Sequence, residues 1–234
     1  KPSGDLAKKV ITKALQSGLD IIPATIRHMG TDKSKQILGA IYETIKDSCE
    51  VRTGTMVEKV LLNPDRSVAG VLLANGEEVH AERILLAPGR EGAAWMEKTV
   101  KDLGLEIESL PVDIGVRVEI PSAWAEDITD QFYEVKALLD TPTFDDKVRT
   151  FCMCPHGEVT SEYQSHHEIL TVNGHSNQGN ESKTENTNFA VLVSTKFTKP
   201  FRDPIGYGSH IARLANMLGG GIIVQRLGDL RKGR

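Results

Sequence analysis

The spacing of apolar residues changes along this chain from the period of helices to the period of strands, and this change constrains the fold most. Before residue 50, apolar residues recur four or five positions apart, which predicts amphipathic helices over 6–18 and over about 33–46. From Glu50 onward, extended runs bounded by turn residues dominate. The sequence therefore predicts a fold that mixes helices with many short strands.

Four strand-like runs follow closely on one another at residues 51–53, 56–62, 68–74 and 79–87. Asn75-Gly76 is a strong hairpin signal, so the last three runs are expected to form a meander. The final run becomes continuously apolar towards Ala87, as a strand covered on both faces does. Pro88-Gly89 then leads into a helix expected at about 91–103, and a strand, a tight turn and a helix start can bring free backbone N–H groups to a ligand.

After Gly104 the chain is mostly extended, which favours antiparallel sheet. Strands are predicted at residues 112–120, 132–138, 148–154, 158–164, 168–172 and 189–197. The polar segment 173–188 is predicted to be a long mobile loop. Helical spacing returns at 207–218 and stops at a run of three glycines.

Composition excludes several classes of protein. The 234 residues are 39% hydrophobic and 26% charged, which is enough for a real core. A net charge of −4 without a long basic block argues against a nucleic-acid partner. No apolar run approaches the roughly 20 residues of a membrane span, and three cysteines make no disulfide framework. We expect a cytoplasmic protein with reduced thiols, and the missing initiator Met and the basic, polar end suggest a fragment of a longer chain.

Two cysteines stand one residue apart in Cys152-Met153-Cys154-Pro155-His156, where alternation along a strand places both sulfurs on one face. Zinc is one interpretation, because histidines follow downstream at His166, His167 and His175. However, Cys-x-Cys is not the usual zinc spacing and these histidines lack helical spacing, so no metal site is predicted. A redox or substrate-facing role and a plain role as small buried strand residues are the alternatives.

Several other polar residues are candidates for a site. An anionic substrate could pair with an arginine, and the candidates are Arg117, Arg149, Arg213 and Arg226. His175 could donate a proton in a cleft. The alternatives are surface salt bridges for the arginines and a solvated loop position for His175.

Residues 33–90 resemble a segment of the two-domain FAD-dependent oxidoreductases. The segments that carry this resemblance are Gly54-Thr55-Met56-Val57, Gly70-Val71, Asn75-Gly76 and Ala87-Pro88-Gly89-Arg90. Further segments, at 28–33, 112–119, 149–155, 172–176 and 225–229, resemble the branch labelled NAD(FAD)-utilising dehydrogenases. The resemblance implies an α+β or α/β fold in which a partial FAD-binding domain (helix, β-meander and strand) is interleaved with an antiparallel-sheet second domain for substrate.

In this scheme residues 31–108 are the partial FAD-binding segment and residues 109–234 are the antiparallel-sheet substrate domain with its C-terminal helix. Residues 1–30 belong to the second domain or connect to it. The resemblance implies that Met56 and Val57 lie near the adenine, with plain meander packing as the alternative. It implies that the four residues of the turn, Ala87, Pro88, Gly89 and Arg90, lie near the adenosine or pyrophosphate.

The Gly-x-Gly-x-x-Gly element that holds the pyrophosphate in such enzymes is missing from this chain. Gly206-Tyr207-Gly208 lacks the third glycine and follows no apolar strand. We therefore expect that the fragment alone is inactive and binds FAD weakly or not at all. FAD is expected in the intact parent, with NAD(P)H as a candidate reductant.

The sequence thus favours the central fragment of an FAD-dependent oxidoreductase, a dehydrogenase in which flavin passes a hydride or an electron pair to or from a small-molecule substrate. Cys152 and Cys154 are the candidate catalytic residues. No nucleic acid or membrane is expected as a partner. The alternative is a non-catalytic protein- or metal-binding module that presents the 173–188 loop.

Overall fold

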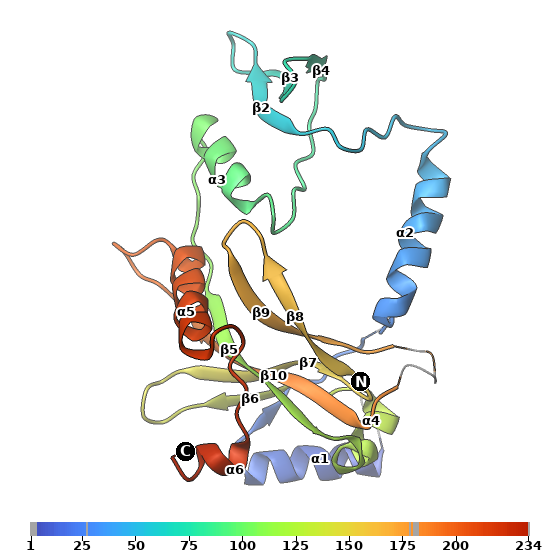
Figure 1. The fold of residues 1–234 in the computed structure, drawn as a ribbon, viewed down its shortest axis with the longest axis vertical. Coiled ribbons are helices and arrows are strands. Elements are labelled where there is room, and N and C mark those ends of the chain that lie inside the picture. Colours follow the sequence, from blue (N-terminus) through green and yellow to red (C-terminus); the bar gives the residue numbers. More distant parts are fainter. Residues whose placement is uncertain (1–3, 27, 178, 180–182, 234) are drawn as a thin grey trace. The chain divides into compact units, whose positions relative to one another are not determined.

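The computed structural model describes residues 4–26, 28–177, 179 and 183–233, and the chain divides into two compact units (Figure 1). The first unit joins Lys1–Ile37 to Ser109–Arg234, and the second is Leu38–Glu108. Each unit has its own sheet, so each is described by itself.

The first unit is built on an antiparallel sheet that, within the described residues, has five strands in the order β1-β6-β7-β10-β5. These strands are β1 (Asp20–Ile21), β5 (Val112–Pro121), β6 (Ala137–Asp140), β7 (Lys147–Cys154) and β10 (Asn186–Thr195). β10 pairs along its whole length with β5 and is bordered on its other side by β7. Thr187 and Asn188 of β10 are fully buried, so the centre of this sheet carries polar side chains.

A separate hairpin of β8 (Glu158–Gln164) and β9 (Ile169–His175) contacts β7, β10 and β5. Helix α1 (Asp5–Gln16) contacts β1, and α5 (Pro204–Gly219) packs against β5 and β9. Gly206-Tyr207-Gly208 lies in the first turns of α5, where the Asp203 side chain accepts a hydrogen bond from the Gly206 N–H as an N-cap. The short elements of this unit are η1 (Ser122–Trp124), α4 (Glu126–Phe132) and α6 (Leu227–Leu230).

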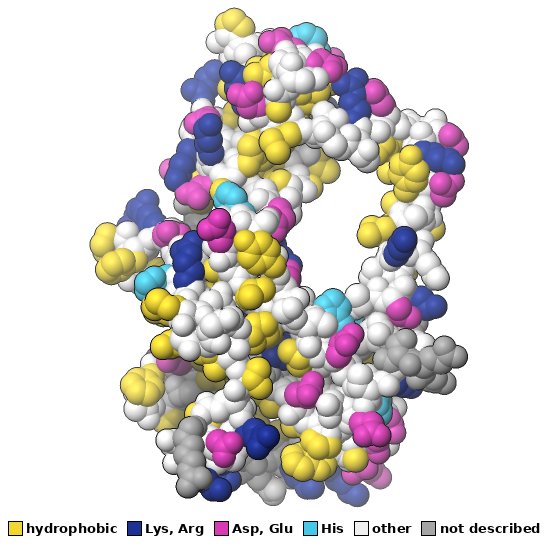
Figure 2. All heavy atoms as spheres, viewed as in Figure 1, with side chains coloured by type: hydrophobic (Ala, Val, Ile, Leu, Met, Phe, Trp, Pro, Cys, Tyr) yellow, Lys and Arg dark blue, Asp and Glu magenta, His cyan; other side chains and the backbone are white. Residues whose placement is uncertain are grey.

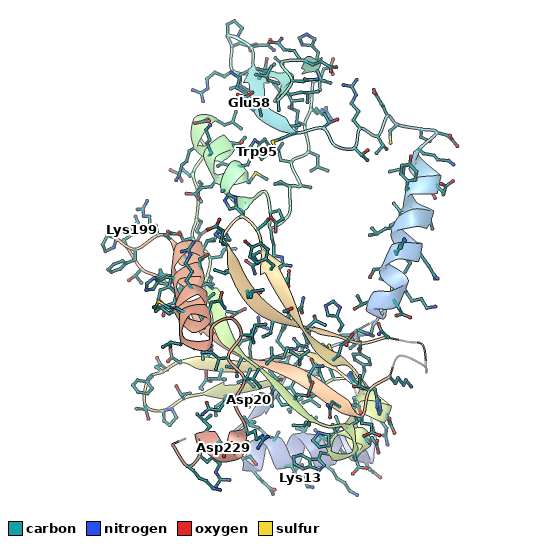
Figure 3. The ribbon with its side chains drawn as sticks, viewed as in Figure 1. Lys13, Asp20, Glu58, Trp95, Lys199 and Asp229 are labelled. Carbon is teal, nitrogen blue, oxygen red and sulfur yellow. The ribbon has the colours of Figure 1, made fainter. Side chains whose placement is uncertain are left out.

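The second unit contains the meander of β2 (Val57–Leu62), β3 (Val68–Leu73) and β4 (Glu78–His80), followed by α3 (Ala93–Asp102). The Trp95 indole N–H of α3 donates to the Glu58 carbonyl of β2 at 2.8 Å, and both residues are marked in Figure 3. Helix α2 (Thr31–Ile45) runs from the first unit into the second along the chain. The described residues include no helix whose length and apolar character would let it cross a membrane.

The predicted fold class is confirmed, because helices combine with several antiparallel sheets. The predicted helices form α1, α2, α3 and α5, and the predicted meander forms around the Asn75-Gly76 turn. The strands predicted in the second half correspond to β5, β7, β8, β9 and β10.

Three predictions about strands are wrong. Residues 51–53 are not a strand, and the run expected to reach Ala87 ends as β4 at His80, with Leu85 92% exposed. A strand that is apolar on both faces needs a neighbouring strand and cover, and the described part of this unit supplies only β3 beside β4. The strand predicted from Phe132 begins only at Ala137. Residues up to Phe132 form helix α4 instead, because the acidic residues in the first turn of α4 stabilise the helix.

The segment predicted as a long loop, 173–188, is partly sheet. Asn173 to His175 complete β9 and Asn186 to Asn188 begin β10. Residues 178 and 180–182 of the predicted loop lie outside the described residues. Turn-forming residues in the sequence did not prevent extension, because each end has a partner strand to pair with.

Apolar side chains reach the surface over much of the chain, and Figure 2 shows them in yellow along the stretch where Figure 1 draws α2. α2 has no buried residue in the part of the chain that is described. Its exposed large apolar side chains are Ile37, Leu38, Ile41, Tyr42 and Ile45. The stripe that predicted an amphipathic helix is therefore present, but none of the described residues buries it.

Candidate functional site

An irregularity in the pairing of β7 with β10 shapes the surroundings of the two cysteines. Cys154 pairs with Asn188, whereas Phe151 pairs with Ala190, so β7 accommodates one extra residue against β10. Cys152 lies within this bulge and has a φ of 48°, in the left-handed region. A non-glycine residue in that conformation carries strain of about 1–3 kcal/mol, and such strain gathers at functional sites.

The bulge determines which face of the sheet Cys154 occupies. Arg117 of β5 lies opposite Ala190 of β10, and Asn188 is two residues along β10 on the same face. Cys154 lies opposite Asn188 and therefore shares that face. Without the extra residue, simple alternation from Phe151 would turn Cys154 to the other side of the sheet.

The Arg117 guanidinium joins the two cysteines to the centre of the sheet. Its Nε donates to Asn188 Oδ1 at 2.7 Å, and its Nη2 donates to the Cys152 carbonyl oxygen at 2.6 Å. The same Nη2 lies 3.2 Å from Cys154 Sγ. The Cys154 thiol in turn donates to the Cys152 carbonyl oxygen at 3.6 Å. We call Arg117, Cys152, Cys154 and Asn188 the thiol site.

Gly174 of β9 leaves the room that the guanidinium occupies. A Cβ at this position would lie 1.8 Å from Arg117 Nη2 and 2.3 Å from Asn188 Oδ1. Any other residue here would force Arg117 or β9 to move. The hairpin therefore helps to hold the arginine against the two cysteines.

Asn188 brings an unmet donor to the thiol site. Its side chain is completely buried, and its Oδ1 accepts from Arg117, but its Nδ2 has no partner among the described residues. A buried N–H without an acceptor costs about 1–3 kcal/mol. The thiol site thus contains both backbone strain at Cys152 and an unsatisfied amide at Asn188.

The two thiols have opposite electrostatic characters. Hydrogen bonding from the Cys154 thiol, reinforced by Arg117, lowers the pKa of Cys152 to about 5, against the opposing effects of burial and of Glu134. The hydrogen bond with Cys152 and then burial raise the pKa of Cys154 well above its ordinary value. At neutral pH the half-buried Cys152 is the thiolate, and Cys154, which is 3% exposed, keeps its proton.

A second hydrogen-bonded group, which we call the hydroxyl chain, consists of Tyr133, Ser176 and His28. The Tyr133 hydroxyl lies 2.8 Å from Ser176 Oγ, which lies 2.9 Å from His28 Nε2. The Tyr133 and His28 rings are stacked with their centroids 4.1 Å apart. The negative charge of Cys152 acts on both rings, because it raises the pKa of Tyr133 and opposes the lowering of the His28 pKa.

Protonation gives the hydroxyl chain a direction. Burial raises the pKa of Tyr133 to about 12, so the phenol keeps its proton at neutral pH. Burial is also the largest influence on His28, and it lowers the pKa of the imidazole, which favours the neutral ring. Tyr133 can therefore donate to Ser176, and Ser176 can donate to the lone pair of His28 Nε2.

The other predicted polar residues lie elsewhere. Arg149 pairs with Asp113 at 2.6 Å and stacks over Phe151, with its Cζ 4.6 Å from the ring centroid. His175 Nδ1 lies 3.1 Å from Thr31 Oγ1. Among the described residues, no group of three or more His, Cys, Asp or Glu side chains is arranged to hold a metal ion.

The residues predicted to contact FAD lie in the second unit. Met56 is 73% exposed, and Val57 begins β2. Ala87, Pro88 and Arg90 lie outside any strand or helix, and a Cβ placed on Gly89 would meet nothing within 4 Å. The six predicted contacts with FAD stay predictions.

Sequence reasoning did not single out Tyr133, Ser176, His28 or Asn188. The Tyr133 to Ser176 contact joins positions 43 residues apart, and the Ser176 to His28 contact joins positions 148 residues apart. No local pattern reports such pairs. The only signal was indirect, since the segments 28–33, 149–155 and 172–176 all belong to the family resemblance.

One comparison with known proteins matches the chain. The family model described as FAD-dependent protein, C-terminal domain-like, covers residues 111–234. That range includes β5, β7, β9 and β10, which carry the thiol site and Gly174. No curated protein and no solved structure matches the chain.

Proposed function

Because the chain belongs to the family of FAD-dependent proteins that share this C-terminal domain, we propose that it is part of an oxidoreductase that acts on a small molecule. More narrowly, we propose a dehydrogenase in which the thiol site faces the substrate. The observation that carries this proposal is the strained Cys152, held beside Arg117 within a bulge of the matched domain.

Each part of the site has a role in this proposal. Arg117, fixed by Asn188 and by the Cys152 carbonyl, presents a positive charge that binds and orients an anionic or polarised substrate group. Cys152 supplies a thiolate. The hydroxyl chain holds a proton on Tyr133, whose pKa responds to the charge of Cys152.

FAD is assigned by the family and supplies the redox chemistry when it is bound. The roles above are confined to what this chain does with its substrate. We further propose a cytoplasmic location, where the three free cysteines, Cys49, Cys152 and Cys154, stay reduced.

The test is the visible absorption spectrum of the purified full-length parent protein before any cofactor is added. Twin bands of oxidised flavin are expected. A colourless protein that fails to take up added FAD would overturn the proposal.

A second measurement locates the thiol site in the reaction. Cys152→Ser and Cys154→Ser are each expected to slow reduction of the bound flavin by substrate. Cys49→Ser, which alters an exposed thiol in the second unit, is the control. Unchanged turnover in both site variants would remove the cysteines from the active site.

A further inference from the structure

We propose that Cys152 and Cys154 form a dithiol that exchanges with low-molecular-weight disulfides, with Cys152 as the attacking thiol and Cys154 as the resolving thiol. This inference rests on the proposed function, because it names a substrate class for the same site. Its chemistry, however, is completed by this chain and its substrate alone.

The placement of the two sulfurs is the first support. The Cys154 thiol donates to the Cys152 carbonyl oxygen at 3.6 Å, so its sulfur lies beside the backbone of Cys152. The bulge in β7 is what turns Cys154 to the face of Arg117. A second thiol next to an attacking one is the arrangement that releases a mixed disulfide.

Accessibility divides the two roles. Cys152 is half-buried and can be reached by a small molecule, whereas only 3% of Cys154 is exposed. An attacking thiol has to meet a disulfide from solution, while a resolving thiol has only to meet its neighbour. Reactive cysteines lie in partly exposed, electropositive surroundings, and Cys152 meets both conditions.

The charges around the pair favour one thiolate. Arg117 Nη2 lies 3.2 Å from Cys154 Sγ and 2.6 Å from the Cys152 carbonyl oxygen, so its positive charge is shared by both cysteines. Glu134 opposes it, but its carboxylate is paired with Lys136 at 3.5 Å. Tyr133 and His28, on whose pKa values the charge of Cys152 acts, are neutral groups at neutral pH.

The exchange balances in two steps. The Cys152 thiolate attacks one sulfur of R–S–S–R, so the bond between Cys152 and that sulfur forms while the R–S–S–R bond breaks and RS⁻ leaves. This RS⁻ takes the proton of Cys154 and becomes RSH. The Cys154 thiolate then attacks the Cys152 sulfur, closes the intramolecular disulfide and expels the second RS⁻. The protein loses two electrons and the substrate gains them.

The experiment uses the purified full chain with Cys49→Ser, so that only the two site thiols are present. The protein is equilibrated with glutathione disulfide and glutathione, quenched with acid, alkylated and mapped by mass spectrometry. The expected product has lost two hydrogens and carries a disulfide between Cys152 and Cys154.

Single variants separate the two roles. With Cys154→Ser, one glutathione is expected to accumulate on Cys152, because the resolving thiol is gone. With Cys152→Ser, reaction at Cys154 is expected to be about tenfold slower or more, because that thiol is buried and protonated. Far-UV circular dichroism establishes that each variant is folded.

Two results would overturn the inference. In the first, Cys152 and Cys154 of the Cys49→Ser chain stay reduced. This result counts when the ratio of glutathione disulfide to glutathione is high enough to glutathionylate Cys49 of the unaltered chain. The other is equal reaction rates in the two single variants. Neither measurement uses flavin, so a colourless protein that still closes the disulfide overturns the proposed function alone, and a flavin-containing protein that never closes it overturns this inference alone.

Discussion

Cys152 combines three properties that rarely meet at one residue: a left-handed backbone with a φ of 48°, a carbonyl that accepts from Arg117, and a thiol next to another thiol. The first is unfavourable by itself and persists only because β7 and β10 hold the bulge in place. The Arg117 guanidinium and the neighbouring thiol stabilise negative charge on the Cys152 sulfur. The chemistry of this residue therefore depends on contacts that the neighbouring sequence does not supply.

At this scale we predict the pH profile of Cys152 alkylation by iodoacetamide in the Cys49→Ser chain. Since the pKa of Cys152 is lowered to about 5, the alkylation rate should be nearly flat between about pH 6 and 8. The rate should drop as the pH is lowered through about 5, because the thiolate becomes protonated. An ordinary thiol would gain reactivity up to a pH of about 8.5. Peptide mapping of the alkylated residue gives the rate, and a rate that still rises steeply above neutral pH would contradict the prediction.

Two charge-removing substitutions should move that profile in opposite directions. Glu134→Gln removes a negative charge that raises the pKa of Cys152, so the midpoint should fall. Arg117→Gln removes a hydrogen bond and a positive charge that lower the pKa, so the midpoint should rise. Shifts of the same sign in both variants would show that the charges around Cys152 are assigned wrongly.

At the scale of elements, the hairpin of β8 and β9 positions the arginine of a different sheet. The guanidinium of Arg117 lies in the space left by the missing side chain of Gly174 in β9. Its Nε donates a hydrogen bond to the Asn188 side chain in β10. Strands β9 and β10, both far from β5 in the sequence, therefore define the place of one side chain. The alternation of residues within β7 predicted that the sulfurs would share a face, whereas in the structure the bulge interrupts that alternation and places Cys154 on the face of Arg117.

The prediction at this scale is that Gly174→Ala lowers the free energy of unfolding by about 1–3 kcal/mol, because its Cβ would lie 1.8 Å from Arg117 Nη2. It should also raise the pKa of Cys152, since the guanidinium has to move. Gly39→Ala in α2 is the matched control, because a Cβ there meets nothing within 4 Å and no loss of stability is expected. Urea unfolding measures both, and equal effects of the two substitutions would contradict this account.

At the scale of the whole molecule, the two compact units differ in how they are held. The first has a central strand, β10, paired on both sides, with fully buried Thr187 and Asn188. In the second, Leu73 is the buried large apolar side chain among the described residues. α2, which leads from one unit to the other, has 15 residues and no buried side chain, and helices of that length are marginal without packing.

We therefore predict unequal hydrogen exchange along the chain. Amides of β10 should exchange slowest, because both of their neighbours have to open first, and amides of α2 should exchange close to the rate of an unfolded chain. Hydrogen exchange followed by mass spectrometry on peptides from each element checks this. Slow exchange in α2 would show instead that another surface covers its exposed apolar side.

The sequence by itself determined the local elements and the residues that bear chemistry. Apolar periodicity located α1, α2, α3 and α5, and Asn75-Gly76 located the meander, because these depend on neighbours within a few residues. Cys152 and Cys154 were singled out because thiols one residue apart are chemically conspicuous. The family resemblance agrees with the match over residues 111–234.

Tertiary structure alone decided the composition of the site. The choice of Arg117 among four candidate arginines depends on its register opposite Ala190 in β10 and on the space left by Gly174. The hydroxyl chain of Tyr133, Ser176 and His28 depends on hydrogen bonds between distant segments. A strand ending at Ala87 was predicted from local apolarity but did not form. A strand needs neighbouring strands from other parts of the chain, and among the described residues β4 has only β3 beside it. Local patterns record what each residue prefers, whereas side chains meet only where strand register and long-range packing bring them together.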